Sequence, residues 1–158
     1  MTRKEIEALA EGVACNHRTE KQCWIDVHQI VKKLGGKIEY AKPENKIELC
    51  CYADESFKII LLRQPHYHEQ RDRWSIAHAL GHVLMHSHPG KTRLFTREEN
   101  RTECMQANWF AAGLLMPKTS FLTKAKELRN DTEELASLFW VMEGAASSRL
   151  ESFRLGLS

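Results

Sequence analysis

The feature that most constrains this chain is the stretch RDRWSIAHALGHVLMH, which runs from Arg71 to His86. Its apolar residues recur about every 3.6 positions, a period that predicts a helix with one continuous apolar face. That face consists of Ile76, Leu80, Val83 and Leu84. Because much of the remaining stretch is also apolar, we expect the helix to lie inside the molecule. His78 and His82 project from the side away from this face.

Two neighbouring buried imidazoles need partners, because burying polar groups without them costs free energy. A shared metal ion meets this need, since each ring donates a lone pair to the cation at about 2.0–2.1 Å. The spacing of four residues places both rings on one side of successive turns. An isolated pair at this spacing is more often two hydrogen-bonded core histidines. Gly81 favours the metal, because a mid-helix glycine costs about 1 kcal/mol relative to alanine and indicates close approach of another element.

The residue after the first histidine is Ala79, at the position where the zinc-peptidase motif H-E-x-x-H has its glutamate. In such enzymes the glutamate takes a proton from the attacking water, and general-base catalysis contributes about 10²–10⁴-fold to the rate. Alanine has no group that accepts a proton. A peptidase with this sequence is therefore expected to be severely impaired.

Composition limits the remaining possibilities. A chain of 158 residues supports one compact domain, and its 42% apolar and 28% charged residues are ordinary for a soluble protein. Its net charge of +2 does not by itself indicate a nucleic-acid partner. No apolar run approaches the roughly 20 residues of a membrane span, and the N-terminus lacks the apolar core of a signal peptide. We therefore expect a cytoplasmic protein whose five cysteines, with no C-x-x-C pair, are reduced.

The order of the elements predicts an α+β fold. The first 34 residues are expected to form helix in two pieces, broken near ACNHRTEKQC and ended by Gly35-Gly36. Three strand-like segments follow, KIEYA, KIELCCYA and FKIILLR, with turn residues between them. They predict a small antiparallel sheet of about three strands, packed with helices. Beyond QPHYHEQ the chain is expected to be helical to its end.

Three sequence blocks resemble the ImmA/IrrE family of metallopeptidases. The family core reads approximately R-F-[ST]-[IL]-A-H-E-L-G-H-x-L-L-H, and this chain has RWSIAHALGHVLMH from Arg73 to His86. A second family block, E-A-N-x-F-A-A-E-L-L-M-P, is matched by QANWFAAGLLMP from Gln106 to Pro117. A third, C-terminal block is echoed by LASLFWVMEGAASSRLESFRLGLS from Leu135. The blocks occur in the family's order and cover most of residues 24–158.

The resemblance implies a zincin-like, zinc-dependent endopeptidase fold from a bacterium, a phage or a mobile element. The substrates of this family are helix-turn-helix transcriptional repressors, each cut at one site. We accordingly expect a metallopeptidase domain over residues 1–128, with a helical C-terminal extension over 129–158 packed on it. The partner implied is a helix-turn-helix repressor, and neither a membrane nor DNA is an expected direct partner.

The resemblance also assigns roles to individual residues. His78 and His82 match the two zinc ligands of the family, and Ala79 occupies the position of the catalytic general base. Gln106 stands where the third ligand, a glutamate, is usual, and Gly113 replaces another glutamate of the second block. Each of these departures removes a carboxylate.

The third ligand remains open at this point. Gln106 is neutral, so as a ligand it would bind zinc much more weakly than glutamate and leave the ion's charge uncompensated. Glu103 lies one helical turn earlier on the same face and is an alternative metal ligand. Cys104 is a softer candidate that points about 100° away from Glu103. His86 is a further possible donor, which we interpret as structural because the family pattern also has a histidine there.

Two explanations are consistent with the replacement of the three family carboxylates. Either a working enzyme had its base replaced and uses Glu103 or another group as third ligand, or the chain is a natural pseudo-protease that acts by binding and sequestering a regulatory protein. A third reading is DNA binding through residues 131–158, where Arg149 and Arg154 lie on the later helix. The local charge is not notably basic, however, and Trp140 stands where such turns usually have a small residue. A packing role for this segment is therefore preferred.

Two connecting segments could also take part in a site. HYHEQRDR supplies His66 and His68, for which a solvated loop is the preferred reading. The mixed-charge connection of residues 91–103 joins the two metal-bearing helices and could border a substrate groove. An exposed sheet edge near the site would let a substrate add as a strand.

Overall fold

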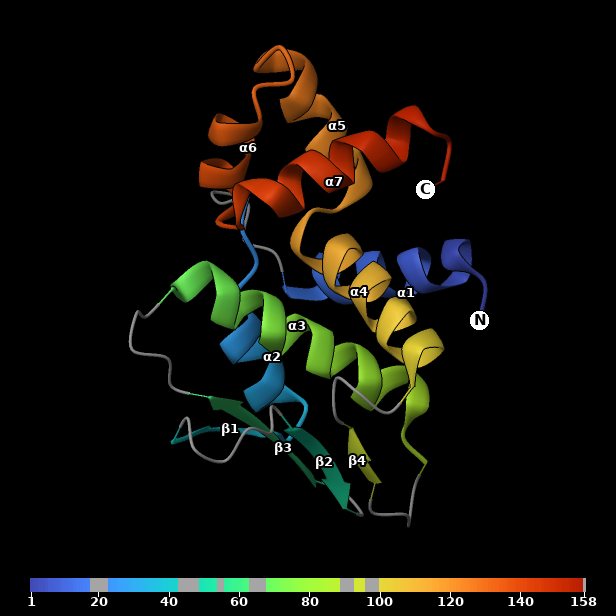
Figure 1. The fold of residues 1–158 in the computed structure, drawn as a ribbon, viewed down its shortest axis with the longest axis vertical. Coiled ribbons are helices and arrows are strands. Elements are labelled where there is room, and N and C mark those ends of the chain that lie inside the picture. The colour runs from blue at the N-terminus through green and yellow to red at the C-terminus, as the bar shows by residue number, and fades with distance from the viewer. Residues whose placement is uncertain are drawn as a thin grey trace. The chain divides into compact units, whose positions relative to one another are not determined.

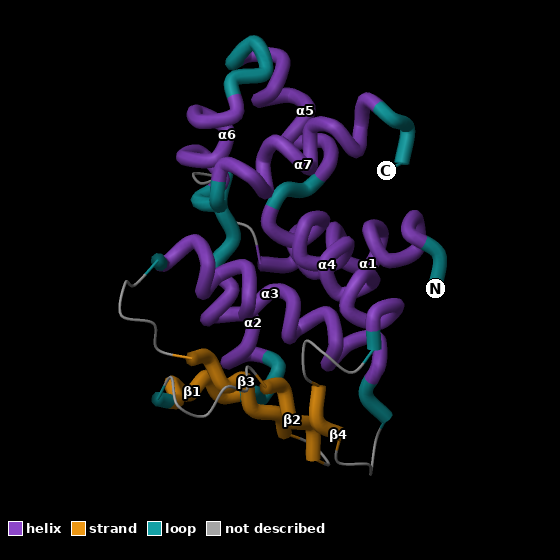
Figure 2. Tube along the Cα trace, viewed as in Figure 1, coloured by secondary structure: helices purple, strands orange, loops and turns teal. Residues whose placement is uncertain are grey.

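The computed structural model describes residues 1–17, 23–42, 49–53, 56–62, 68–88, 93–95 and 100–157 (Figures 1 and 2). The chain forms two compact units. The helical unit consists of Met1–Asp26 and Trp109–Ser158, and the sheet unit consists of Val27–Asn108. Among the described residues, no helix combines the length and apolar character needed to cross a membrane.

The helical unit buries an apolar core between helices from both ends of the chain. Its helices are α1 (Arg3–His17), the C-terminal part of α4 (Arg101–Leu115), α5 (Lys118–Glu127), α6 (Thr132–Phe139) and α7 (Glu143–Arg154). The core residues are apolar and almost wholly buried: Ile6, Ala10, Phe110, Leu114, Phe121 and Phe139. Asp131 begins α6 by accepting a hydrogen bond from the Glu134 backbone N–H, as an N-cap does.

A buried ion pair crosses the core of the helical unit. Arg149 Nη1 lies 2.9 Å from Glu7 Oε1, and Arg149 Nε donates to the Met116 carbonyl oxygen at 3.2 Å. The Arg149 guanidinium also lies over the Phe153 ring. Arg149 is therefore part of the packing between α1 and α7, and it is not an exposed cation for binding phosphate.

Trp140 ends α6 in the left-handed conformation, with φ of 54°. A bulky residue adopts this conformation at a cost, so surrounding structure must hold it there. The Trp140 ring packs edge-on against Trp24, with ring centroids 5.0 Å apart. This aromatic contact and the hydrogen bonds from the Trp140 backbone N–H to the Ala136 and Ser137 carbonyls help to hold the residue in this conformation.

The sheet unit contains a four-stranded sheet with helices beside it. Its elements are α2 (Val27–Lys33), β1 (Lys37–Ala41), β2 (Leu49–Ala53), β3 (Ser56–Leu62), α3 (Glu69–His86), β4 (Arg93–Phe95) and the beginning of α4. Helix α3 packs against α2 and against strands β2 and β3 (Figure 1). Gly35, with φ of 79°, ends α2, and the Gly36 N–H donates back to the Val31 carbonyl at 2.9 Å. The glycine pair thus ends the helix as the sequence predicted.

The α+β class is confirmed, but the predicted antiparallel sheet of about three strands is wrong. The strand order is β1-β3-β2-β4, and β1 runs parallel to β3 with Lys37 opposite Lys58. Strands β3–β2 and β2–β4 are antiparallel. Alternation along a strand indicates which residues share a face, but it does not specify the neighbouring strand. Strand β4 has only three residues, too few to show a periodic pattern.

Several other expectations can be compared with the structure. The break between two N-terminal helices is confirmed by α1 and α2, and residues 18–22 lie outside the described part. On α3, Ile76, Leu80 and Val83 are buried as predicted, but Leu84 is 36% exposed and does not belong to the buried face. His66 and the side chains of Cys50 and Cys51 lie outside the described residues. The division at residues 128/129 falls within the helical unit and stays a prediction.

Candidate metal centre

Three histidines form a continuous row along α3. His78, His82 and His86 follow one another at intervals of four residues, so their rings emerge from successive turns. The Nε2 atoms of His78 and His82 are 3.1 Å apart, and the Nδ1 atoms of His82 and His86 are 3.0 Å apart. The expected pairing of His78 and His82 on one side of the helix is thus present in the structure.

The row is covered on the sheet side by β4. The Phe95 ring stacks on His82, with centroids 4.7 Å apart and planes inclined by 26°. His82 is only 4% exposed and His86 is also buried, whereas His78 remains partly accessible. Water therefore has access to one end of the row, and the other end is largely dry.

Helix α4 supplies the polar partners of the row. Asn100 caps the helix, because its Oδ1 accepts hydrogen bonds from the backbone N–H groups of Thr102 and Glu103, both at 3.1 Å. Further along α4, Asn108 Oδ1 lies 2.9 Å from Nδ1 of His78, and Gln106 Oε1 lies 2.9 Å from Nε2 of His86. An amide oxygen thus contacts each end of the row.

These two oxygens determine which ring nitrogens carry hydrogen in the neutral row. A carbonyl oxygen only accepts, so Nδ1 of His78 donates to Asn108 and Nε2 of His86 donates to Gln106. Nδ1 of His86 is then an acceptor, and it receives the hydrogen of Nδ1 of His82. Consequently, the Nε2 atoms of His78 and His82 both present lone pairs to the same place. A hydrogen bond between them would need an additional proton, whereas one cation satisfies both.

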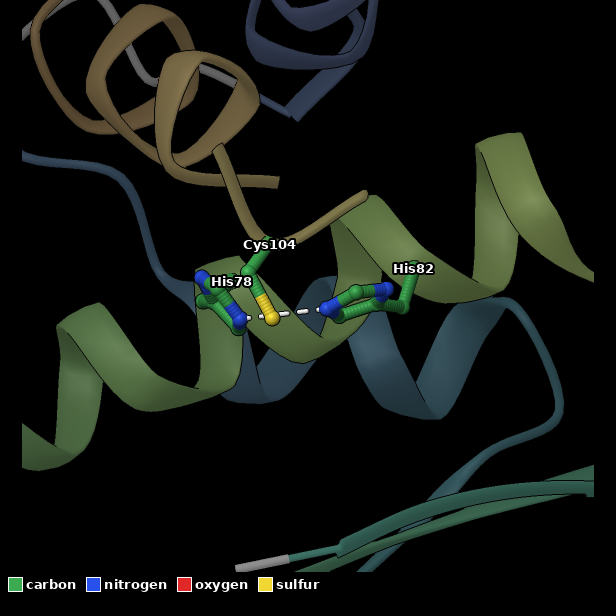
Figure 3. A group of neighbouring side chains, drawn as sticks. All are labelled: His78, His82 and Cys104. Atoms are coloured by element: carbon green, nitrogen blue, oxygen red, sulfur yellow. Dashed lines mark hydrogen bonds between the residues drawn. The ribbon is translucent and has the colours of Figure 1, made fainter. Parts of the chain in front are cut away.

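Among the residues that the structure describes, two groups of side chains have the composition and spacing to hold a metal ion. The first consists of His78, His82 and Cys104, shown in Figure 3, and the second consists of His82, His86 and Glu103. Within each group the potential ligand atoms lie within 4.8 Å of one another. The sequence placed Glu103 near the metal as an alternative ligand, and the structure brings it to the His82–His86 end of the row.

The other predicted site residues lie as follows. Gln106, expected as third ligand, contacts His86, and Ala79 is buried on α3 beside His78. Sequence reasoning assigned no role to Asn108, although its contact with His78 is one of the bonds that define the site. The interval of four residues between Cys104 and Asn108 was the available signal, because it places both on one face of α4. The assignment of metal ligands remains a prediction.

A model of the family Peptidase_M78, described as the IrrE N-terminal-like domain, matches residues 31–151. The matched segment is more than half of the chain and includes the complete histidine row and α4. No curated protein matches the chain.

Proposed function

Because the chain belongs to the Peptidase_M78 family of IrrE N-terminal-like domains, we propose that this metallopeptidase-like regulator binds zinc and recognises a helix-turn-helix repressor. With alanine at position 79, it holds this partner better than it cuts it. The observation that carries the proposal is the close approach of the His78 and His82 rings, whose Nε2 atoms are 3.1 Å apart. We place the protein in the cytoplasm, where such a repressor acts and thiols stay reduced.

The histidine pair fits zinc in both distance and orientation. Two nitrogens bound to one tetrahedral zinc ion at about 2.0–2.1 Å are about 3.3 Å apart, close to the 3.1 Å between these Nε2 atoms. Asn108 holds the His78 ring through Nδ1, and His86 holds the His82 ring in the same way. Such outer partners fix the tautomer and orientation of a metal-binding histidine. His78 and His82 are therefore the proposed zinc ligands, with Gln106 or Glu103 predicted as the third.

Bound zinc would supply Lewis-acid polarisation of a scissile carbonyl. The residues around it must then orient the peptide and move a proton. Position 79 cannot take the proton, because its side chain is a buried methyl group. Since a positioned general base contributes about 10²–10⁴-fold, binding without efficient cleavage is the expected behaviour of the chain as written.

An extended segment of the partner has a place to bind beside the site. Within the described sheet, β4 pairs with β2 and ends the strand order. Its residue Phe95 lies directly on His82, so a strand added to β4 would run next to the metal ligands. Peptide segments commonly bind by adding a strand to a sheet edge, with backbone hydrogen bonds providing affinity. We propose β4 as the edge that receives the repressor.

A natural pseudo-protease is the second candidate, and the packing at Gly113 favours it. A Cβ atom at this position would lie 3.0 Å from Cβ of Ala10 and 3.7 Å from Cα of Glu7. The side chain of the family's glutamate would therefore collide with α1. The glycine at position 113 thus fits the close packing of α1 against α4. This fit favours a natural loss of the carboxylate during evolution, in which the chain lost catalysis and kept the ability to sequester a regulator.

Restoring the carboxylate tests the proposal. We would compare the chain, Ala79→Glu and the uncharged, equally large Ala79→Gln on candidate helix-turn-helix repressors. We expect all three to bind the repressor, and only Ala79→Glu to cleave it, about 10²–10⁴ times faster than the others. Tight binding without cleavage by Ala79→Glu would favour the sequestering protein. Absence of repressor binding by every form would contradict the proposal.

A further inference from the structure

We infer that Cys104, as a thiolate, is the third protein ligand of the zinc ion held by His78 and His82. The inference rests on the proposed function because both require a metal at the histidine pair. It replaces the neutral Gln106 and Glu103, which is grouped with His82 and His86, as third ligand, and it gives Gln106 a positioning role instead.

Placement of the sulfur is the first argument. Of the two potential metal groups among the described residues, only the one with Cys104 contains both histidines whose Nε2 atoms converge. Figure 3 shows the Cys104 side chain reaching from α4 towards the line that joins these two atoms. Glu103 is grouped with His82 and His86, and not with His78. The thiol therefore lies where the lone pairs meet.

The rotation of α4 is the second argument. Asn108 contacts His78 and lies one turn after Cys104, so these two side chains share one face of α4. Glu103 and Gln106 share a neighbouring face, directed towards His86. The bond between Asn108 and His78 thus fixes the face on which Cys104 is presented. The Gln106 oxygen, in contrast, already accepts the hydrogen of His86.

Charge is the third argument. Two neutral imidazoles and an amide leave the full +2 charge of zinc in a largely buried place, where an uncompensated charge is costly. A thiolate reduces the charge of the site to +1, as the family's glutamate would. On binding, the thiol proton passes to solvent and a zinc–sulfur bond forms, since only the thiolate is a ligand. Zinc binds histidine nitrogen and cysteine sulfur together, and a site with three protein ligands keeps an open fourth position.

Cobalt(II) provides a direct test, because a thiolate ligand gives its complex an intense near-ultraviolet charge-transfer band. The full chain would be titrated with cobalt(II) and then with zinc under reducing conditions. We expect a single equivalent to bind with this band. Cys104→Ser should lose the band and weaken zinc binding by more than about 100-fold, beyond the 10–100-fold typical of outer partners. Cys104→Asp should recover affinity without the band, which separates ligation from folding.

The controls distinguish the possible failures. Cys23→Ser, at a partly exposed thiol of the helical unit, should change neither band nor affinity. If wild-type protein binds cobalt without the band, or if Glu103→Gln and not Cys104→Ser abolishes binding, the inference about Cys104 is wrong while the zinc site stands. If metal binding is absent, or is unaffected by His82→Ala, the proposed zinc site itself fails.

Discussion

Arg149 and Glu7 form a buried ion pair between two helices that lie at opposite ends of the chain, with 2.9 Å between Nη1 and Oε1. The arginine side chain is 1% exposed and the glutamate side chain is 8% exposed. Removing one member would leave the other charge buried without its main counterion. The pair thus links α1 to α7, and its removal tests how much this contact contributes to the stability of the helical unit.

We predict that Glu7→Ala lowers the free energy of unfolding by about 3–5 kcal/mol, the usual cost of breaking a buried pair. Urea unfolding followed by circular dichroism measures this change. The matched control is Glu151→Ala, which removes the exposed partner of Arg154 at 3.7 Å. It should change stability by less than about 0.5 kcal/mol. Equal effects of the two substitutions would contradict the importance of burial.

Two helical glycines should respond to alanine in opposite directions. Gly12→Ala should stabilise the protein by about 0.5–1 kcal/mol, because its Cβ would meet no described atom within 4 Å. Gly113→Ala should destabilise it by about 1 kcal/mol, because its Cβ would press on Ala10 and force α1 to shift. Thermal unfolding measures both. A double variant, Ala10→Gly with Gly113→Ala, that is more stable than the sum of the two single effects would identify the contact as the cause.

Asn108 should influence zinc binding without contacting the ion. Asn108→Ala removes the acceptor for Nδ1 of His78 and is expected to weaken zinc binding by about 10–100-fold. Asn108→Asp keeps an acceptor oxygen and should retain the affinity. Competition with a chromophoric chelator gives these constants. Met105→Ala, at an exposed position of the same helix, serves as the control, and a similar loss there would point to damage of α4 instead.

Zinc should stabilise the folded chain through the histidine pair. A ligand that binds only the folded state adds about 2.7 kcal/mol at a concentration 100 times its Kd. We therefore expect Tm to rise with zinc and to fall again when a chelator removes it. In His82→Ala the shift should disappear. A shift of the same size in this variant would place the stabilising metal elsewhere.

The sequence predicted the local features of the site, but it did not predict how the elements that form the site pack together. The period of the Arg71–His86 stretch predicted α3, and the interval between His78 and His82 predicted that their rings would meet. The exposure of Leu84 was missed, because a period gives the apolar face only to within one residue. Strand β4, which supplies Phe95, was too short to predict.

The third-ligand question shows why the remainder could not be read from the chain. Spacing on α4 indicates that Glu103 and Gln106 lie near one face and that Cys104 lies on another. It does not indicate which face is turned towards α3. That rotation follows from contacts between distant residues, such as the bond from His78 to Asn108. A local pattern contains no information about such contacts.

The contact between Gln106 and His86 gives the histidine row a polarity. An amide has an oxygen at one corner and an NH₂ group at the other, so half a rotation of the Gln106 end group would reverse donor and acceptor at His86 and His82, while Asn108 keeps His78 unchanged. His82 would then point a hydrogen, not a lone pair, at His78. With Asn108 placed as it is, only one orientation of the Gln106 amide leaves a lone pair on both Nε2 atoms for a cation, and a bound ion would in turn prevent that amide from turning.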